Sequence, residues 1–119
     1  MIIDDEPLGA ELLKVMIQAN YRVEVDVFHQ PLSGLARLHF QKYQVICLDY
    51  LMPRMTGSVI VQDIRTSMGP NADTPVLMVT ARREQLDEMG LQNFRDVFIL
   101  EKPLEELKFL AQIEALLKR

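Results

Sequence analysis

Apolar positions along the chain fall into short segments of two kinds that alternate. Residues 45–48 and 76–79 are uninterrupted apolar runs, which is typical of strands buried on both faces of a sheet. Residues 21–28 alternate valines with charged residues, which predicts a half-buried strand at a sheet edge. Further strands are predicted at residues 1–3 and 97–100.

The segments that follow these strands carry apolar residues at helical spacing, and each predicts one helix. The five predicted helices cover residues 8–19, 32–40, 56–67, 84–89 and 104–117. The first is indicated by Leu8, Leu12, Val15, Met16 and Ala19. Regular alternation of strand and helix is typical of an α/β fold with a parallel sheet and helices packed on both of its faces.

Composition narrows the class of protein. The 119 residues are 49% hydrophobic and 25% charged, as in one soluble globular domain. A net charge of -4 disfavours direct binding of nucleic acid, which requires clustered basic residues. Cys47 is the only cysteine, which excludes a disulfide framework and fits a reducing cytoplasm. No apolar stretch is long enough for a membrane span, so no membrane partner is expected.

Polar residues follow the predicted strands at their carboxyl ends, which meet at one edge of a parallel sheet. These residues are Asp4, Asp5, Asp49, Thr80 and Lys102. Two carboxylates about 4 Å apart repel by about 4 kcal/mol at an effective dielectric of about 20. A lysine and a hard divalent cation with oxygen ligands, Mg²⁺ or Mn²⁺, are therefore expected beside them.

Four motifs in this order carry a resemblance to a known family. They are DDE at residues 4–6, LDYLMPRMTG at 48–57, VTA at 79–81 and EKP at 101–103. With these motifs the whole chain resembles the receiver domain of two-component response regulators. The resemblance implies a flavodoxin-like, doubly wound sheet of five parallel strands in the order 2-1-3-4-5, with five helices in three layers.

The resemblance also implies a site. Asp49 would accept a phosphoryl group from a histidine kinase or a phosphotransfer protein. Asp5, Asp49 and the backbone carbonyl of Leu51 would bind Mg²⁺, and Asp4 would act through a water molecule. The product would be an acyl phosphate, which hydrolyses readily and so makes a reversible switch, not an enzyme in the ordinary sense.

The remaining roles concern the phosphoryl oxygens and the output. The Thr80 hydroxyl, the backbone N–H of Ala81 and Lys102 would contact the phosphoryl group, and the Lys102–Pro103 peptide bond would be cis. Leu51 and Arg82 would flank the group and influence its hydrolysis. An output domain or a downstream protein would bind through the fourth helix, fifth strand and fifth helix, and a homodimer is a further hypothesis.

Some positions depart from the family pattern. Ile99 stands where receivers usually have an aromatic switch residue, and the neighbouring Phe98 should point to the opposite face of the strand. Phe94 and Arg95 replace a common Gly-Ala pair. The first strand is shorter than usual, so we expect residues 1–119 to be one receiver domain trimmed at its start and excised from a longer protein.

Other interpretations stay open on the sequence alone. Residues 4–6 could cap the first helix, Asp49 could be a turn residue, and His29 and His39 indicate solvated or packing roles. A degenerate receiver would serve only as a docking or dimerisation module, which the atypical Ile99 favours. A haloacid-dehalogenase-like phosphatase would need Asp-x-Asp after the first strand, but Glu6 stands at the third position. A flavodoxin-type FMN site would need a Ser/Thr-rich loop that residues 7–10 lack.

Overall fold

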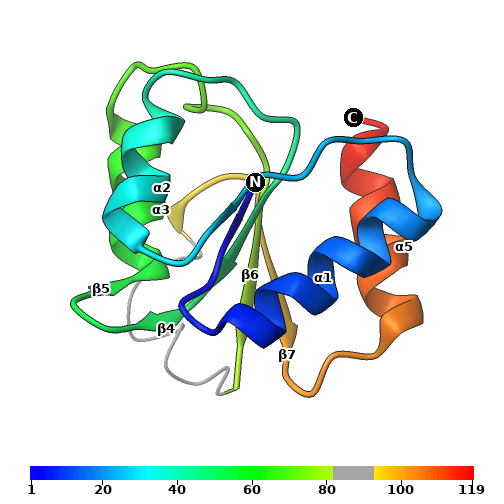
Figure 1. Ribbon diagram of the computed structural model, residues 1–119. Helices are drawn as coiled ribbons and strands as arrows, with labels where there is room; N and C mark the ends of the chain where they lie inside the picture. The colour runs from blue at the N-terminus through cyan, green and yellow to red at the C-terminus, as the bar shows by residue number, and fades with distance from the viewer. Residues whose placement is uncertain (82–92) are drawn as a thin grey trace.

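A parallel sheet of five strands forms the centre of the molecule, as the computed structural model shows (Figure 1). The structure describes residues 1–81 and 93–119. The strands lie in the order β2-β1-β3-β6-β7. Their bounds are β1 Ile2–Ile3, β2 Val27–Phe28, β3 Ile46–Asp49, β6 Val76–Thr80 and β7 Val97–Glu101. Because β6 and β7 are the fourth and fifth strands of this sheet, the expected order is confirmed.

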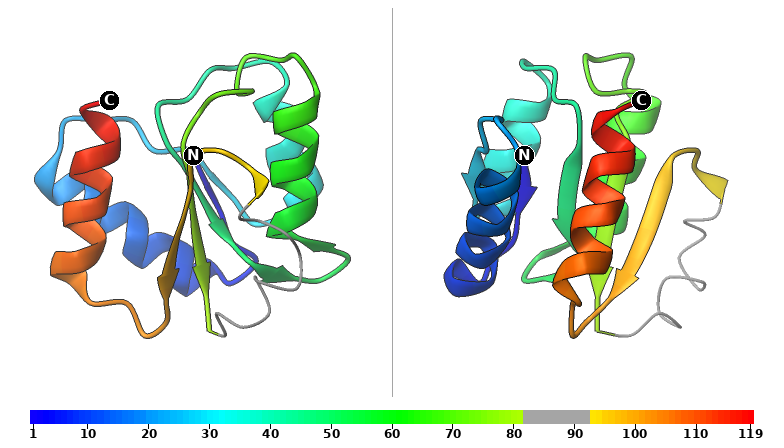
Figure 2. Two further views of the ribbon diagram at one scale, coloured as in Figure 1. Left: turned by 180° about the vertical axis from the view of Figure 1, so that it is seen from behind. Right: turned by 90° about the vertical axis from the view of Figure 1, so that its right-hand side faces the viewer.

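Helices cover both faces of the sheet, which gives the three predicted layers (Figure 2). On one face lie α1 (Pro7–Asn20) and α5 (Glu106–Leu117). On the other lie α2 (Pro31–Leu38) and α3 (Gly57–Thr66). The helix predicted at residues 84–89 lies outside the described residues. None of the described helices has the length and apolar character needed to cross a bilayer.

Alternation along β3 explains why this strand lies at the centre. Ile46 and Leu48 pack in the cluster beneath α2 and α3, whereas Cys47 packs in the cluster beneath α1 and α5. All three side chains are buried. Burial of one large aliphatic side chain contributes about 1.5–3 kcal/mol. An uninterrupted apolar run is therefore stable only where both faces of the strand are covered.

The first helix is confirmed, but most of the residues that indicated it do not face the core. Its buried side chains are Ala10, Leu13 and Ile17. Leu8, Leu12 and Val15 are exposed by 88%, 59% and 54%. Both sets are apolar and both have helical spacing, so periodicity predicts the helix without showing which face packs on the sheet.

The predicted second strand is much shorter in the structure. Of residues 21–28, only Val27 and Phe28 pair with β1, opposite Ile2 and Ile3. Residues 23, 25 and 27 nevertheless pack together against the core cluster beneath α1 and α5, as the alternation predicted. Because β1 is itself only two residues long, its ladder with β2 is limited to two residue pairs. The predicted edge position of the strand is confirmed.

A small hairpin that the sequence did not predict lies between β3 and α3. It pairs β4 (Leu51–Met52) with β5 (Met55–Thr56). Arg54 in its turn has a φ of 70°, and Pro53 stands before it. Proline followed by a residue with positive φ is typical of a type II turn. Consequently α3 begins one residue later than predicted.

Asn71 joins three parts of the chain near the amino ends of β3 and β6. Its Oδ1 accepts hydrogen bonds from the Tyr43 N–H at 2.9 Å and the Thr74 hydroxyl at 3.0 Å. Its Nδ2 donates to the carbonyls of Leu38 at 2.6 Å and Gln41 at 2.7 Å. The side chain is 1% exposed, so these four bonds form away from water.

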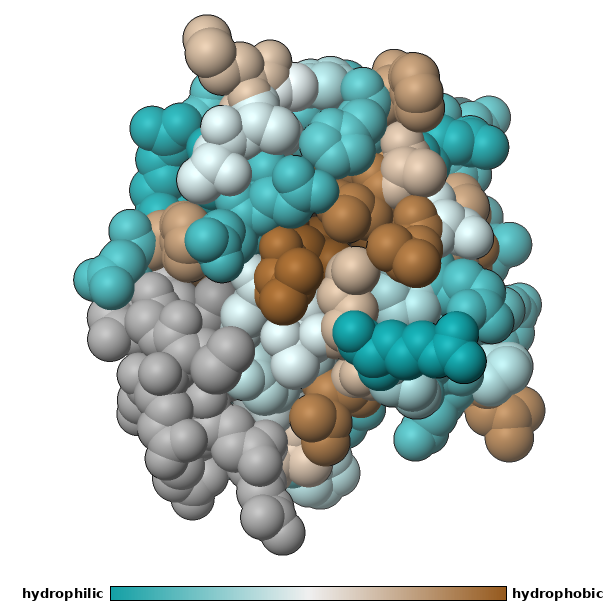
Figure 3. Space-filling view, turned by 90° about the vertical axis from the view of Figure 1, so that its left-hand side faces the viewer, coloured by the Kyte–Doolittle hydropathy of each residue, from teal (hydrophilic) through white to brown (hydrophobic). Residues whose placement is uncertain are grey.

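Apolar residues in α5 serve mainly the core. Phe109, Ile113 and Leu116 are buried, and Leu110 packs against the same cluster. Leu107 is the one large apolar residue of this helix that is exposed, at 82%. Core packing therefore accounts for most of the large apolar residues of α5. On the opposite side of the molecule, the side covered by α2 and α3, apolar surface also reaches solvent (Figure 3).

Candidate metal and phosphoryl site

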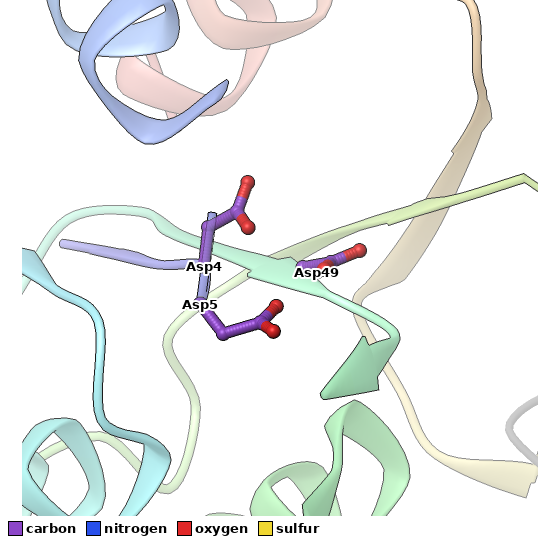
Figure 4. Close-up of side chains that lie close together, drawn as sticks. All are labelled: Asp4, Asp5 and Asp49. Carbon is purple, nitrogen blue, oxygen red and sulfur yellow. The ribbon is translucent and has the colours of Figure 1, made fainter. Parts of the chain in front are cut away.

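Three carboxylates gather where β1 and β3 end (Figure 4). Asp4 and Asp5 directly follow β1, and Asp49 is the last residue of β3. One oxygen from each lies within 4.8 Å of the other two. Asp4 is 5% exposed and Asp49 is 9% exposed. The structure thus brings together the three acidic residues that the strand topology predicted to meet.

The loop after β1 is held by hydrogen bonds to Asp4. The Asp4 N–H donates to the Phe28 carbonyl at 3.0 Å, which continues the β1–β2 pairing beyond the strand. The Asp4 carboxylate accepts the Glu6 N–H at 2.9 Å. Glu6 is the N-cap of α1 and makes no side-chain cap bond. Asp4 therefore stabilises the turn that leads into α1, and it uses one of its two carboxylate oxygens, Oδ1, for this bond.

Lys102 provides the positive charge of the site. Its Nζ lies 3.3 Å from Asp49 Oδ1, across 53 residues of sequence. Its backbone N–H donates to the Thr80 carbonyl at 2.7 Å, so the end of β6 fixes the start of the Lys102 loop. The peptide bond from Lys102 to Pro103 is cis, as the resemblance implied. Among the described residues, Lys102 is the one cation that forms an ion pair with a carboxylate of this cluster.

Burial raises the pKa of Asp49 from 3.8 to about 6. The charge and hydrogen bond of Lys102 lower it, and the charges of Asp4 and Asp5 raise it. One lysine therefore does not neutralise the cluster. Three carboxylates with converging oxygens form a hard, anionic donor set of the kind that binds Mg²⁺ or Mn²⁺ in proteins. The residues present fit such an ion.

The raised pKa predicts how stability depends on pH in metal-free protein. Because the folded state holds the Asp49 proton more tightly, stability falls as pH rises from about 3.8 through about 6. At pH 7.5 Asp49 is ionised, and its burial then lowers the free energy of unfolding by the full amount, about 3 kcal/mol. Asp49→Asn removes the ionisation, so in urea denaturation with EDTA its gain in stability should be larger at pH 7.5 than at pH 5, by about 1 kcal/mol. An equal gain at both pH values would contradict the raised pKa.

The other expected site residues lie on elements at the same edge. Thr80 ends β6, which pairs with β3 on one side and β7 on the other, and its side chain is buried. Ala81 follows it and is exposed. Leu51 begins β4, two residues after Asp49, and is 65% exposed. Arg82 lies outside the described residues.

Gly57 is a site residue whose importance the sequence did not reveal. A β-carbon at this position would lie 2.5 Å from Met78 Sδ and 3.2 Å from the Asp49 carbonyl oxygen. Met78 is fully buried in β6, so it has little room to move. Glycine therefore lets the start of α3 approach the strand that carries Asp49.

The residues before Lys102 point to alternate faces of β7, as the sequence predicted. Ile99 packs on the cluster beneath α2 and α3, and Phe98 packs on the cluster beneath α1 and α5. The Phe98 ring lies 5.6 Å from the Arg119 guanidinium carbon. Phe98 therefore cannot take the place of an aromatic residue at position 99.

Comparisons with known proteins find relatives over the length of this chain. The family model described as the response regulator receiver domain matches residues 1–114. The chain is 30% identical over 120 residues to the transcriptional regulatory protein CpxR homolog of Haemophilus influenzae, and the alignment covers 100% of this chain and 50% of that protein. It thus spans about half the length of the curated relatives it matches.

Solved structures have the same fold. The chemotaxis response regulator CheY4 of Vibrio cholerae superposes with a TM-score of 0.81 at 25% identity, over 97% of this chain and 94% of that one. The receiver domain of the sensor histidine kinase PA1611 of Pseudomonas aeruginosa PAO1 has a TM-score of 0.83 at 20% identity, over 99% of this chain and 95% of that one. That structure has a magnesium ion coordinated in its active site cleft.

Proposed function

Because this chain belongs to the response regulator receiver domain family, we propose that it is a phosphorylation-dependent signalling switch in which Asp49 accepts a phosphoryl group in a Mg²⁺-dependent reaction. Receiver domains of two-component systems are signalling domains, distinct from ordinary enzymes. The observation that carries the proposal is the pairing of Lys102 with Asp49 at 3.3 Å inside a cluster of three carboxylates. A site with the full set of charges favours phosphorylation over a docking-only role.

Asp5, Asp49 and the backbone carbonyl of Leu51 would hold the ion, and Asp4 would act through a water molecule. The converging oxygens of the three carboxylates support this ligand set. When bound, Mg²⁺ neutralises charge on the carboxylates and on the phosphoryl oxygens. Asp4 is the most buried of the three, and its carboxylate already accepts the Glu6 N–H. Both features suit a residue that holds a water molecule beside the ion and does not itself react.

In the transfer, an Asp49 oxygen forms a bond to phosphorus while the bond from phosphorus to the donor imidazole breaks. The imidazole nitrogen keeps the electron pair of the broken bond. Lys102, the Thr80 hydroxyl and the Ala81 N–H stabilise the negative charge on the phosphoryl oxygens. Hydrolysis of the acyl phosphate returns the Asp49 carboxylate and releases inorganic phosphate, so the state is reversible.

The phosphodonor in this proposal is a histidine kinase or a phosphotransfer protein, and residues 1–119 act as one receiver domain. The response passes to an output domain or a downstream protein through the surface formed by the fourth helix of the family fold, β7 and α5. The exposed Leu107 at the start of α5 supports this surface. A homodimer through the same surface is part of the proposal.

Two substitutions separate metal binding from phosphoryl transfer. Asp5→Ala is expected to weaken Mg²⁺ binding by at least about tenfold, because it removes a charged ligand. Lys102→Ala should leave Mg²⁺ binding intact or tighter, because it removes a competing positive charge, and should slow modification by acetyl phosphate by about a hundredfold. Calorimetric Mg²⁺ titration and intact mass spectrometry measure the two effects.

Lys108→Ala is the matched control for the lysine. Lys108 lies in the first turn of the following helix, is 72% exposed and pairs only with Glu105 among the described residues. Its removal should change neither measurement. If Lys102→Ala were modified as fast as wild type, or if Asp5→Ala bound Mg²⁺ equally well, the proposed roles would be wrong.

A further inference from the structure

His29 makes a contact with the acidic site that the sequence did not indicate. It directly follows β2, and its Nδ1 lies 3.1 Å from the backbone carbonyl oxygen of Asp4. Because a carbonyl oxygen only accepts hydrogen bonds, Nδ1 carries the proton and donates. The ring is exposed on its outer side, so this bond forms at the rim of the site.

The end of β2 holds the Asp4 backbone at both of its polar groups. Phe28 accepts the Asp4 N–H at 3.0 Å, and the adjacent His29 donates to the Asp4 carbonyl. That carbonyl belongs to the peptide unit that joins Asp4 to Asp5. Since the peptide unit is planar, fixing its carbonyl also fixes the direction in which the Asp5 chain continues. The His29 bond therefore influences where the Asp5 carboxylate points.

Of the three carboxylates, that of Asp5 depends most on the backbone for its orientation. Asp4 accepts the Glu6 N–H and Asp49 pairs with Lys102, but the Asp5 carboxylate accepts no hydrogen bond from any residue in the described ranges. Beside it lies an open hollow of about 520 Å³. The hollow is lined by Asp5 itself, three prolines (Pro7, Pro31 and Pro53), His29 and Arg54, among others. An unsupported Asp5 carboxylate can turn into this space, away from Asp4 and Asp49.

We propose that His29 is a positioning residue for the metal site, which holds the Asp4–Asp5 peptide so that the Asp5 carboxylate faces the cation. The inference rests on the proposed function and adds a residue outside the four motifs to the site. His29 acts through the backbone and does not contact the ion or the phosphoryl group. Its effect should therefore appear in Mg²⁺ affinity and not in the rate of phosphoryl transfer once the site is saturated.

Two substitutions test the hydrogen bond. His29→Phe keeps a ring of similar size and removes the donor, whereas the side-chain N–H₂ of His29→Asn can occupy the position of Nδ1. We expect His29→Phe to bind Mg²⁺ about fivefold more weakly, as for loss of one partly exposed hydrogen bond, and His29→Asn to bind within about twofold of wild type. Calorimetry is suitable because the chain has no tryptophan to report binding by fluorescence.

A second readout separates positioning from general loss of structure. At saturating Mg²⁺ both variants should be modified by acetyl phosphate at the wild-type rate, and their thermal unfolding temperatures in EDTA should lie within about 5 °C of wild type, the range that fits loss of one hydrogen bond. Wild-type affinity in His29→Phe, or equal weakening in His29→Asn, would overturn the role of His29 and leave the proposed function standing. If wild type itself bound no Mg²⁺, both would be overturned.

Discussion

Asp49→Asn is expected to reduce modification by acetyl phosphate by about a thousandfold or more, because a neutral amide of the same size is a very poor nucleophile. The substitution preserves the shape of a side chain that is 9% exposed, so the fold should persist. It should also be more stable than wild type in metal-free buffer at pH 7.5, because burial of the ionised carboxylate is unfavourable. Intact mass spectrometry after incubation with acetyl phosphate and Mg²⁺ measures the first effect.

The control for this loss is Asp63→Asn. Asp63 lies on α3, is 38% exposed and pairs with His39 at 3.2 Å, and it is not part of the acidic cluster. This variant should gain the phosphoryl group at the wild-type rate. Equal modification of Asp49→Asn and wild type would mean that another residue is the acceptor.

Asn71→Ala is expected to lower the free energy of unfolding by about 3–5 kcal/mol. The substitution leaves the Tyr43 N–H, the Thr74 hydroxyl and the carbonyls of Leu38 and Gln41 without their partner. A buried polar group left unpaired costs about 1–3 kcal/mol, and water entering the cavity would recover part of this. For a domain of this size the loss corresponds to a fall in Tm of more than about 10 °C.

Urea denaturation followed by circular dichroism measures this effect, with Asn20→Ala as the control. The Asn20 amide makes one exposed hydrogen bond, to the Met16 carbonyl at 2.8 Å. Its loss should cost less than about 1 kcal/mol. If Asn71→Ala and Asn20→Ala were equally stable, the four hydrogen bonds of Asn71 would not contribute to the free energy of unfolding as expected.

Much of the site could be predicted because it depends on topology. Parallel strands place their carboxyl ends at one edge, so residues as far apart as Asp5, Asp49 and Lys102 could be expected to meet there. The structure places Lys102 against Asp49 and gathers the carboxylates, without any local sequence signal that links them. The alternate faces of Phe98 and Ile99 follow from the regular alternation of side chains along a strand. The strand order was predicted through the resemblance to receiver domains.

What could not be predicted depends on contacts between side chain and backbone. His29 bonds a carbonyl, a group present at every position, so no residue pattern distinguishes it from a solvated histidine. The need for Gly57 at the start of α3 arises from the position of Met78 on β6. In α1, both candidate faces are apolar, and only tertiary packing selects the one with Leu13. These features are visible only in the folded structure, because the contacting group is either distant in sequence or a backbone carbonyl like that of every other residue.

The most direct test of the account is to locate the phosphoryl group on wild-type protein. After incubation with acetyl phosphate, with Mg²⁺ or with EDTA, borohydride reduction of the acyl phosphate followed by peptide mass mapping identifies the acceptor. The account predicts a single modified aspartate, Asp49, and modification only with Mg²⁺. A modified histidine or a different carboxylate, or equal modification in EDTA, would contradict it.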